Sequence, residues 1–138
     1  MFGSAVCCRA TGVYCYHCDL LVDLPGLHVV RVDCHQLGLR IMMESARRCM
    51  GCFGCGVLVQ GHGRMPVELI DAPCFTASVW LSWRKRRWRC LDPDCAVTSF
   101  AEQSPQVAAA RALLTARATR WAIQQGCFEN ASIQGLAR

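Results

Sequence analysis

The sequence contains no long apolar run. No stretch approaches the ~20 apolar residues that a membrane-spanning helix needs, and the first residues do not join a basic start to an apolar segment, as a signal peptide does. Aromatic residues make up only 8% of the 138 residues, so a large self-sufficient core is not expected. These absences predict a cytoplasmic chain with no membrane segment, whose small fold needs extra stabilisation.

Common catalytic motifs are missing as well. The sequence shows no Ser/His/Asp set and no glycine-rich loop that would cradle a phosphate. The histidines His28, His35 and His62 are scattered over expected strands and turns, where ordinary surface or half-buried roles account for them. None of these patterns therefore points to an active site. A cysteine-based redox site is kept as one alternative because cysteines are so numerous.

Cysteine is the exception to this scarcity, with 12 in the chain. In a cytoplasmic protein, clustered cysteines favour a metal over disulfides. Two tight turns carry spaced pairs, Cys52-x-x-Cys55 and Cys90-x-x-x-x-Cys95. Each turn places two thiolates on one side of an ion, and two such turns at the ends of adjacent hairpins close a tetrahedral zinc site, as in a zinc ribbon. Four thiolates leave no position open for water, so the predicted role of the zinc is structural.

The choice of cysteines leaves alternatives. Cys49-x-x-Cys52 overlaps the preferred pair, which is favoured because Gly56 follows Cys55 and glycine accepts the positive φ that such a turn often needs. Cys15-x-x-Cys18 is another possible half-site with no evident second half, and the roles of Cys7 and Cys8 stay open. Three further cysteines are expected to be small buried hydrophobes: Cys34, Cys74 and Cys127.

The pattern of apolar residues predicts an α+β fold in which a small zinc-ribbon-like antiparallel β domain precedes a helical segment. Residues 1–26 are poorly patterned, residues 27–103 hold a β hairpin and the zinc ribbon, and residues 104–138 are helical. The expected hairpin joins 27–33 to 39–44 through a turn at 35–38. Further strands are expected at 57–59, 67–70 and 78–89.

The helical segment has clear boundary signals. Ser104 is a capping hydroxyl and Pro105 suits the first helical position, so a helix is expected over 106–125. Gly126 is expected to end it, and a second helix is expected from Ala131.

The strand expected at 78–89 carries an unusual concentration of charge. Five of the 15 basic residues lie within 84–89, which is the electrostatic footprint of a polyanion partner. Alternation places Val79, Leu81 and Trp83 on one face, and on the other Trp80, Arg84, Arg86 and Trp88. An alternative interpretation is an edge strand kept soluble by its charges, with the tryptophans in the core. The predicted nucleic-acid contacts are Trp83, Arg84, Lys85, Arg86, Arg87, Trp88, Arg89, Arg111, Arg117 and Arg120.

Six short motifs follow one another along the chain: Cys52-Phe-Gly-Cys55-Gly56, His62-Gly-Arg64, Leu69-Ile-Asp71-Ala-Pro-Cys74, Trp83-Arg-Lys-Arg-Arg-Trp-Arg-Cys90, Pro93-x-Cys95 and Ser99-Phe-Ala-Glu-Gln103. Together they resemble the N-terminal zinc finger of bacterial insertion-sequence transposases of the ISL-three family, actinobacterial members above all. The resemblance runs from about residue 20 to residue 138. It implies a zinc ribbon followed by a helix-turn-helix, with Cys52, Cys55, Cys90 and Cys95 as the zinc ligands.

The resemblance also implies a partner and a missing part. Members of the family bind the terminal inverted repeats of a mobile element as double-stranded DNA, and continue into a catalytic domain with acidic metal ligands. The 138 residues leave no room for that domain or for the recognition helix. The expectation is therefore a truncated, DNA-binding piece of a transposase without catalysis, whose oligomeric state stays open. The alternative from another class is a zinc-ribbon module that binds a protein partner.

Overall fold

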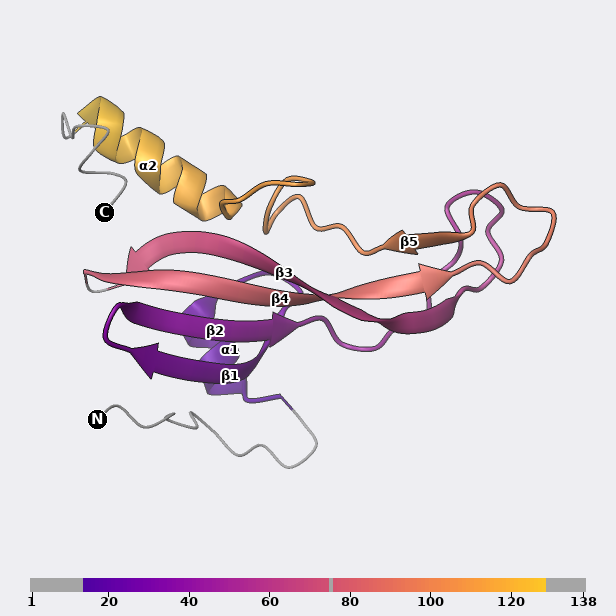
Figure 1. Cartoon of the computed structure of the whole chain (residues 1–138), viewed down its shortest axis with the longest axis horizontal. Helices are drawn as coiled ribbons and strands as arrows, with labels where there is room; N and C mark the ends of the chain where they lie inside the picture. Colours follow the sequence, from indigo (N-terminus) through magenta and orange to yellow (C-terminus); the bar gives the residue numbers. More distant parts are fainter. Residues whose placement is uncertain (1–13, 75, 129–138) are drawn as a thin grey trace.

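The computed structural model describes residues 14–74 and 76–128 of the chain. Its elements, in chain order, are α1 (Tyr16–Val22), β1 (His28–His35), β2 (Gly38–Glu44), β3 (Gln60–Cys74), β4 (Ala77–Arg89), β5 (Ser99–Ala101) and α2 (Ala116–Phe128). Figure 1 shows the long β3–β4 hairpin running along the molecule, with β5 and the cysteine-bearing loops at one end of it. The fold is α+β, as predicted.

The strands form one sheet in the order β1-β2-β4-β3, and β5 adds to β4. All neighbouring pairs are antiparallel except β2 and β4, which run parallel. The predicted hairpin over 27–44 is confirmed, and Gly38 in its turn has a φ of 145°. The expected strand 67–70 is the middle of the much longer β3. The expected strand 57–59 is only a single bridge from Leu58 to Gly51.

One face of the sheet carries the core. The predicted alternation is confirmed along β4, because Val79, Leu81 and Trp83 are 3%, 0% and 1% exposed. They pack with Met43 of β2, with Leu24 in the segment that follows α1, and with Val107 in the loop after β5. Within residues 14–74 and 76–128, no helix is long and apolar enough to cross a bilayer.

Helix α1 was missed by the sequence analysis, which described the first 26 residues as poorly patterned. The helix spans only two turns and ends at Asp23, whose φ of 52° is left-handed. Its buried residue is Cys18, which joins the apolar core. A helix of this length carries almost no periodic signal, so packing against the sheet decides its conformation.

The helix expected over 106–125 is wrong at both ends. Helix α2 begins at Ala116 and continues through Gly126 to Phe128. The segment before it instead lies along β3, where Ile70 N donates to Leu113 O (2.8 Å) and Thr115 N donates to Ile70 O (3.0 Å). The alanine-rich stretch has high helix propensity, but propensity is a weak preference that tertiary hydrogen bonds and burial override. The expected second helix from Ala131 falls outside the described residues.

Thr115 fixes where α2 begins. Its hydroxyl accepts a hydrogen bond from Ala118 N at 3.1 Å, which caps the first turn of the helix. The same hydroxyl donates to Asp71 Oδ1 at 2.7 Å, and Thr115 is 0% exposed. The cap therefore ties the start of α2 to β3.

Candidate metal centre

The four predicted zinc ligands come together in the structure. The sulfur atoms of Cys52, Cys55, Cys90 and Cys95 all lie within 4.8 Å of one another. The sulfur of Cys52 lies 3.8 Å from that of Cys95, and the sulfur of Cys55 lies 3.6 Å from that of Cys90. Four sulfurs at 2.3 Å from a tetrahedral zinc would be about 3.8 Å apart. The group can therefore hold a metal ion, and its geometry is compatible with zinc.

The first pair of sulfurs sits on a miniature hairpin over residues 50–59. Cys52 N donates to Val57 O (2.8 Å), and Gly56 N donates to Cys52 O (2.8 Å). Gly56 has a φ of 77°, so the positive φ that favoured the Cys52/Cys55 pair is present. Cys49 is exposed and is not one of the four clustered cysteines.

The second pair follows directly from β4. Cys90 N donates to Thr98 O at 3.0 Å, which continues the pairing of β4 with β5, and Cys95 N donates to Asp92 O at 3.2 Å. The two turns fit closely, because a Cβ added at Gly54 would lie 2.9 Å from Val97 Cγ2 and 3.2 Å from Cys95 Sγ. A side chain at position 54 would therefore push apart the turn that carries Cys52 and Cys55 and the turn that carries Cys90 and Cys95. We call these two turns the first and the second knuckle.

The thiols differ in acidity. The backbone N–H groups of Cys55 and Gly54 stabilise the Cys52 thiolate and lower the pKa of Cys52 to about 7. The backbone at Val57 acts in the same direction on Cys55, but burial and the neighbouring thiols outweigh it and raise the pKa of Cys55 to about 12. A metal that binds at neutral pH must therefore displace protons, because only thiolates are good ligands.

Several predicted nucleic-acid contacts are inside the protein, which corrects the expectation for them. Trp83 and Trp88 are 1% and 3% exposed, so a base cannot stack on either indole. Lys85 is 8% exposed, lies 4.5 Å from the centre of the Trp83 ring and donates to Gln103 Oε1 at 3.2 Å. Burial lowers the pKa of Lys85. The alternative that placed tryptophans in the core is confirmed for these two, although β4 is an inner strand and not an edge.

The predicted contacts in the helical segment also change. Arg111 lies before α2, not on it, and has a φ of 60°. Arg117 is bound to Asp71 through two hydrogen bonds, from Nε and Nη2, so it is held by the fold. Arg120 is on α2 and exposed, as Arg89 is at the end of β4, whereas Arg87 is half-buried.

Arginines gather instead on the sheet face opposite the core. Register places Arg64 of β3 across from Arg86 of β4, and Arg84 of β4 across from Glu44 of β2. Arg64 Nε and Arg84 Nη1 lie 3.6 and 3.3 Å from Glu44 Oε2. Burial, followed by the nearby charges of Arg64 and Arg47, lowers the pKa of Arg86. We call this group the arginine face: Arg47, Arg64, Arg84 and Arg86.

The arginine face contains two residues that the sequence analysis missed, Arg47 and Arg64. Arg84 keeps 43% of its side chain exposed, and Arg47 is exposed. Arg86 packs over the Trp88 ring at 4.5 Å, and its Nη1 atom has no hydrogen-bond partner among the described residues. Counting residues back from the Cys74–Ala77 pair would have placed Arg64 opposite Arg87. The bulge between Asp71 and Cys74, which moves Arg64 opposite Arg86, cannot be read from the sequence.

The exposure of two cysteines contradicts the sequence analysis. Cys74 and Cys127 were expected to be small buried hydrophobes, but both are exposed, and Cys34 is half-buried. Cys74 lies at the end of β3, where the chain turns into β4, and Cys127 lies on the last turn of α2. Chain turns and helix ends are where burial is least complete, which explains the difference.

Comparisons with known proteins add no family to this description. No protein-family model, curated protein or solved structure matches the chain. In the described residues, four cysteines can hold a metal ion, and one face of the sheet carries arginines.

Proposed function

We propose that the chain is a zinc-stabilised module that binds double-stranded DNA, as the N-terminal part of an insertion-sequence transposase does. The observation that carries the proposal is the group of four cysteine sulfurs within 4.8 Å of one another. Zinc is the metal that best fits an all-thiolate tetrahedral site in a chain of this kind, and four thiolates make the role structural. The motifs that resemble the transposase family include these four cysteines.

The arginine face supports DNA as the partner. Its four guanidinium groups come from β3, β4 and the loop after β2, with Glu44 and the buried Glu102 as acids near them. The backbone of a duplex carries closely spaced phosphates, and arginine binds phosphate through paired hydrogen bonds. Phosphate contacts position a protein without reading sequence. The module therefore holds DNA through Arg47, Arg84 and Arg86.

The proposal is tested by titrating the purified chain with labelled duplex at several salt concentrations. Each phosphate neutralised contributes about −0.9 to the log–log slope of affinity against salt. The double variant Arg47→Ala/Arg84→Ala removes two exposed guanidinium groups, so its slope should be shallower by about 1.8 than that of the parent chain. A duplex from the terminal repeats of the mobile element and a duplex of random sequence should give similar slopes, because phosphate contacts do not read sequence.

Arg111→Ala/Arg120→Ala is the matched control, because both arginines are exposed and lie outside the sheet, Arg111 before α2 and Arg120 on it. It should leave the slope unchanged, and both double variants should retain zinc. A flat slope for the parent chain would exclude DNA, and binding to a protein partner would then be the leading function. If only the control variant made the log–log slope of affinity against salt shallower, the contact surface would lie around α2 and not on the arginine face.

A further inference from the structure

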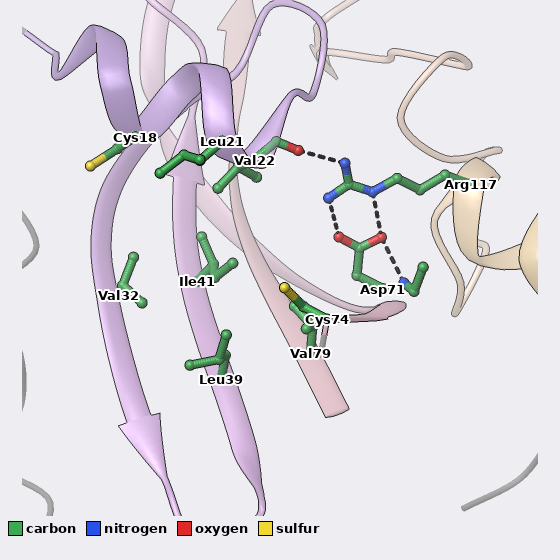
Figure 2. A pocket seen from close by; sticks show the side chains of 11 residues that line it. Cys18, Leu21, Val22, Val32, Leu39, Ile41, Asp71, Cys74, Val79 and Arg117 are labelled. Carbon is green, nitrogen blue, oxygen red and sulfur yellow. Dashed lines mark hydrogen bonds and ion pairs between the residues drawn. The ribbon is translucent and has the colours of Figure 1, made fainter. Parts of the chain in front are cut away.

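A second site lies on the opposite side of the sheet from the arginine face. It is a pocket of about 250 Å³ between α1, the sheet and the start of α2. Figure 2 shows aliphatic side chains from α1, β1 and β2 pointing into it, with Asp71 and Arg117 at one side. The lining residues that the argument uses are Leu21, Val32, Leu39, Ala72, Asp71 and Arg117.

The two charged residues at the pocket are occupied with each other. Asp71 accepts hydrogen bonds from Thr115 Oγ1 (2.7 Å), from Ala72 N (2.9 Å) and from Arg117. The remaining terminal nitrogen of Arg117 donates to Val22 O. A ligand with its own charge would have to break this network or remain without a partner, and either outcome costs binding free energy.

The pocket exists because α1 is too short to cover the sheet. Its seven residues leave Val32 and Leu39 only partly buried at the edge of the core. Leu21, also on α1 and lining the pocket, is 85% exposed. Water fills such a space poorly, because aliphatic walls offer it no hydrogen bonds. An apolar molecule would gain by replacing that water and by covering the side chain of Leu21.

We propose that this pocket binds a small, neutral, apolar molecule of about the size of one aromatic ring. The volume accommodates one ring, and apolar cavities smaller than this one are known to take up benzene. The aliphatic walls select against charge, and the mutually satisfied Asp71–Arg117 pair provides no anchor for a polar group. The inference does not depend on DNA or zinc binding.

Fluorobenzene is the probe, and its binding is followed by ¹⁹F NMR together with amide shifts of the ¹⁵N-labelled full chain. We expect one site with a Kd on the order of 1 mM, as the few heavy atoms of the probe allow. The shifted amides should belong to residues 18–22, 39–41 and 72–74. 4-Fluorobenzoate, which carries the same ring with a charge, should bind at least ten times more weakly.

Filling the pocket provides the second arm. Ala72→Leu places extra atoms among the lining residues and should weaken fluorobenzene binding at least tenfold, while zinc content stays unchanged. Ala109→Leu adds the same atoms at an exposed position outside the pocket and should bind as the parent does. If Ala72→Leu does not fold, Val32→Phe takes its place. No binding up to the solubility limit, or equal binding by the filled variant, would overturn the proposal.

Discussion

The two ends of the β3–β4 hairpin are stabilised in different ways. From its turn to its middle, the hairpin packs against fully buried side chains: Leu81 and Trp83 of β4 and Met43 of β2 are at most 1% exposed. At the other end, beyond Arg89, apolar side chains face solvent, as Phe53 at 73%, Leu58 at 65% and Leu91 at 59% do. Burial cannot hold the second end, but the four clustered sulfurs can when they bind a metal. The comparison explains how a chain with few aromatics can order a long hairpin.

The largest expected effect is the loss of metal. Structural zinc in small fingers contributes on the order of 10 kcal/mol of coupled folding free energy. A strong chelator should therefore unfold residues 50–59 and 90–98, while the amides of β1, β2 and the first half of β4 stay protected. Hydrogen exchange of the holo and chelated protein measures this. If residues 50–59 and 90–98 stayed as protected as β1 and β2 after chelation, the metal would not be what stabilises that end of the hairpin.

A core substitution should have the opposite pattern. Leu81 is 0% exposed, so Leu81→Ala should lower the free energy of unfolding of the sheet by about 2–5 kcal/mol. Denaturant unfolding followed by tryptophan fluorescence gives the loss. Zinc should remain at one equivalent in the folded variant, because the extended strand β4 separates Leu81 from Cys90 by about 30 Å. Leu91→Ala is the matched control, since Leu91 is 59% exposed and should cost much less.

The Asp71–Arg117 pair joins α2 to the core end of the hairpin. Burial opposes the charge on Asp71, but its hydrogen bonds to Arg117 and Thr115 outweigh that effect and lower the pKa of Asp71. A carboxyl whose pKa is lower in the folded state contributes stability that is present above its unfolded pKa, about 3.9, and lost as the pH falls through the folded pKa. Asp71→Asn should lower stability at pH 7 by about 1–3 kcal/mol.

The acid dependence is the sharper readout. Urea unfolding between pH 5 and pH 2 should show the parent losing the contribution of Asp71 below about pH 4. The Asp71→Asn variant should show a shallower loss over the same range. Asp92→Asn, at a half-buried turn position outside the core, is the control. Parallel pH profiles for the parent and Asp71→Asn would mean that the ion pair contributes nothing to folding.

The smallest expected effect concerns the first knuckle. Gly56 has a φ of 77° with nothing within 4 Å of an added Cβ, so Gly56→Ala adds backbone strain without a clash. The cost of a left-handed conformation for alanine is about 1–2 kcal/mol, and it should appear as weaker zinc affinity in a competition titration. Gly56→Asn should be milder, because asparagine tolerates this conformation. Equal affinities for all three chains would mean that the knuckle relaxes.

Some parts of the structure could be predicted from the sequence, and others could not. The pairs Cys52/Cys55 and Cys90/Cys95 were found because the spacing of the two knuckles is local. The hairpin over 27–44 was found for the same reason. The start of α2 was missed because it depends on hydrogen bonds between β3 and Leu113 and Thr115, more than forty residues further along the chain.

The arginine-rich strand shows the same limit. Alternation correctly separated Val79, Leu81 and Trp83 from Arg84 and Arg86. Period two places Lys85 on the same face as Trp83. Alternation could not show that Lys85 and Trp88 are covered, because burial at the end of β4 depends on β5 and on Gln103. Nor could it show that the charge of Arg47 acts on Arg86, since that proximity depends on the parallel pairing of β2 with β4.

The most direct test of the central claim is the zinc content of the purified chain and of two cysteine variants, measured by elemental analysis after exhaustive dialysis. The account predicts about one equivalent in the parent and in Cys49→Ser, because Cys49 is outside the cluster. It predicts far less in Cys90→Ser, which removes one of the four sulfurs. Zinc absent from the parent, or equal amounts in Cys90→Ser and the parent, would contradict it.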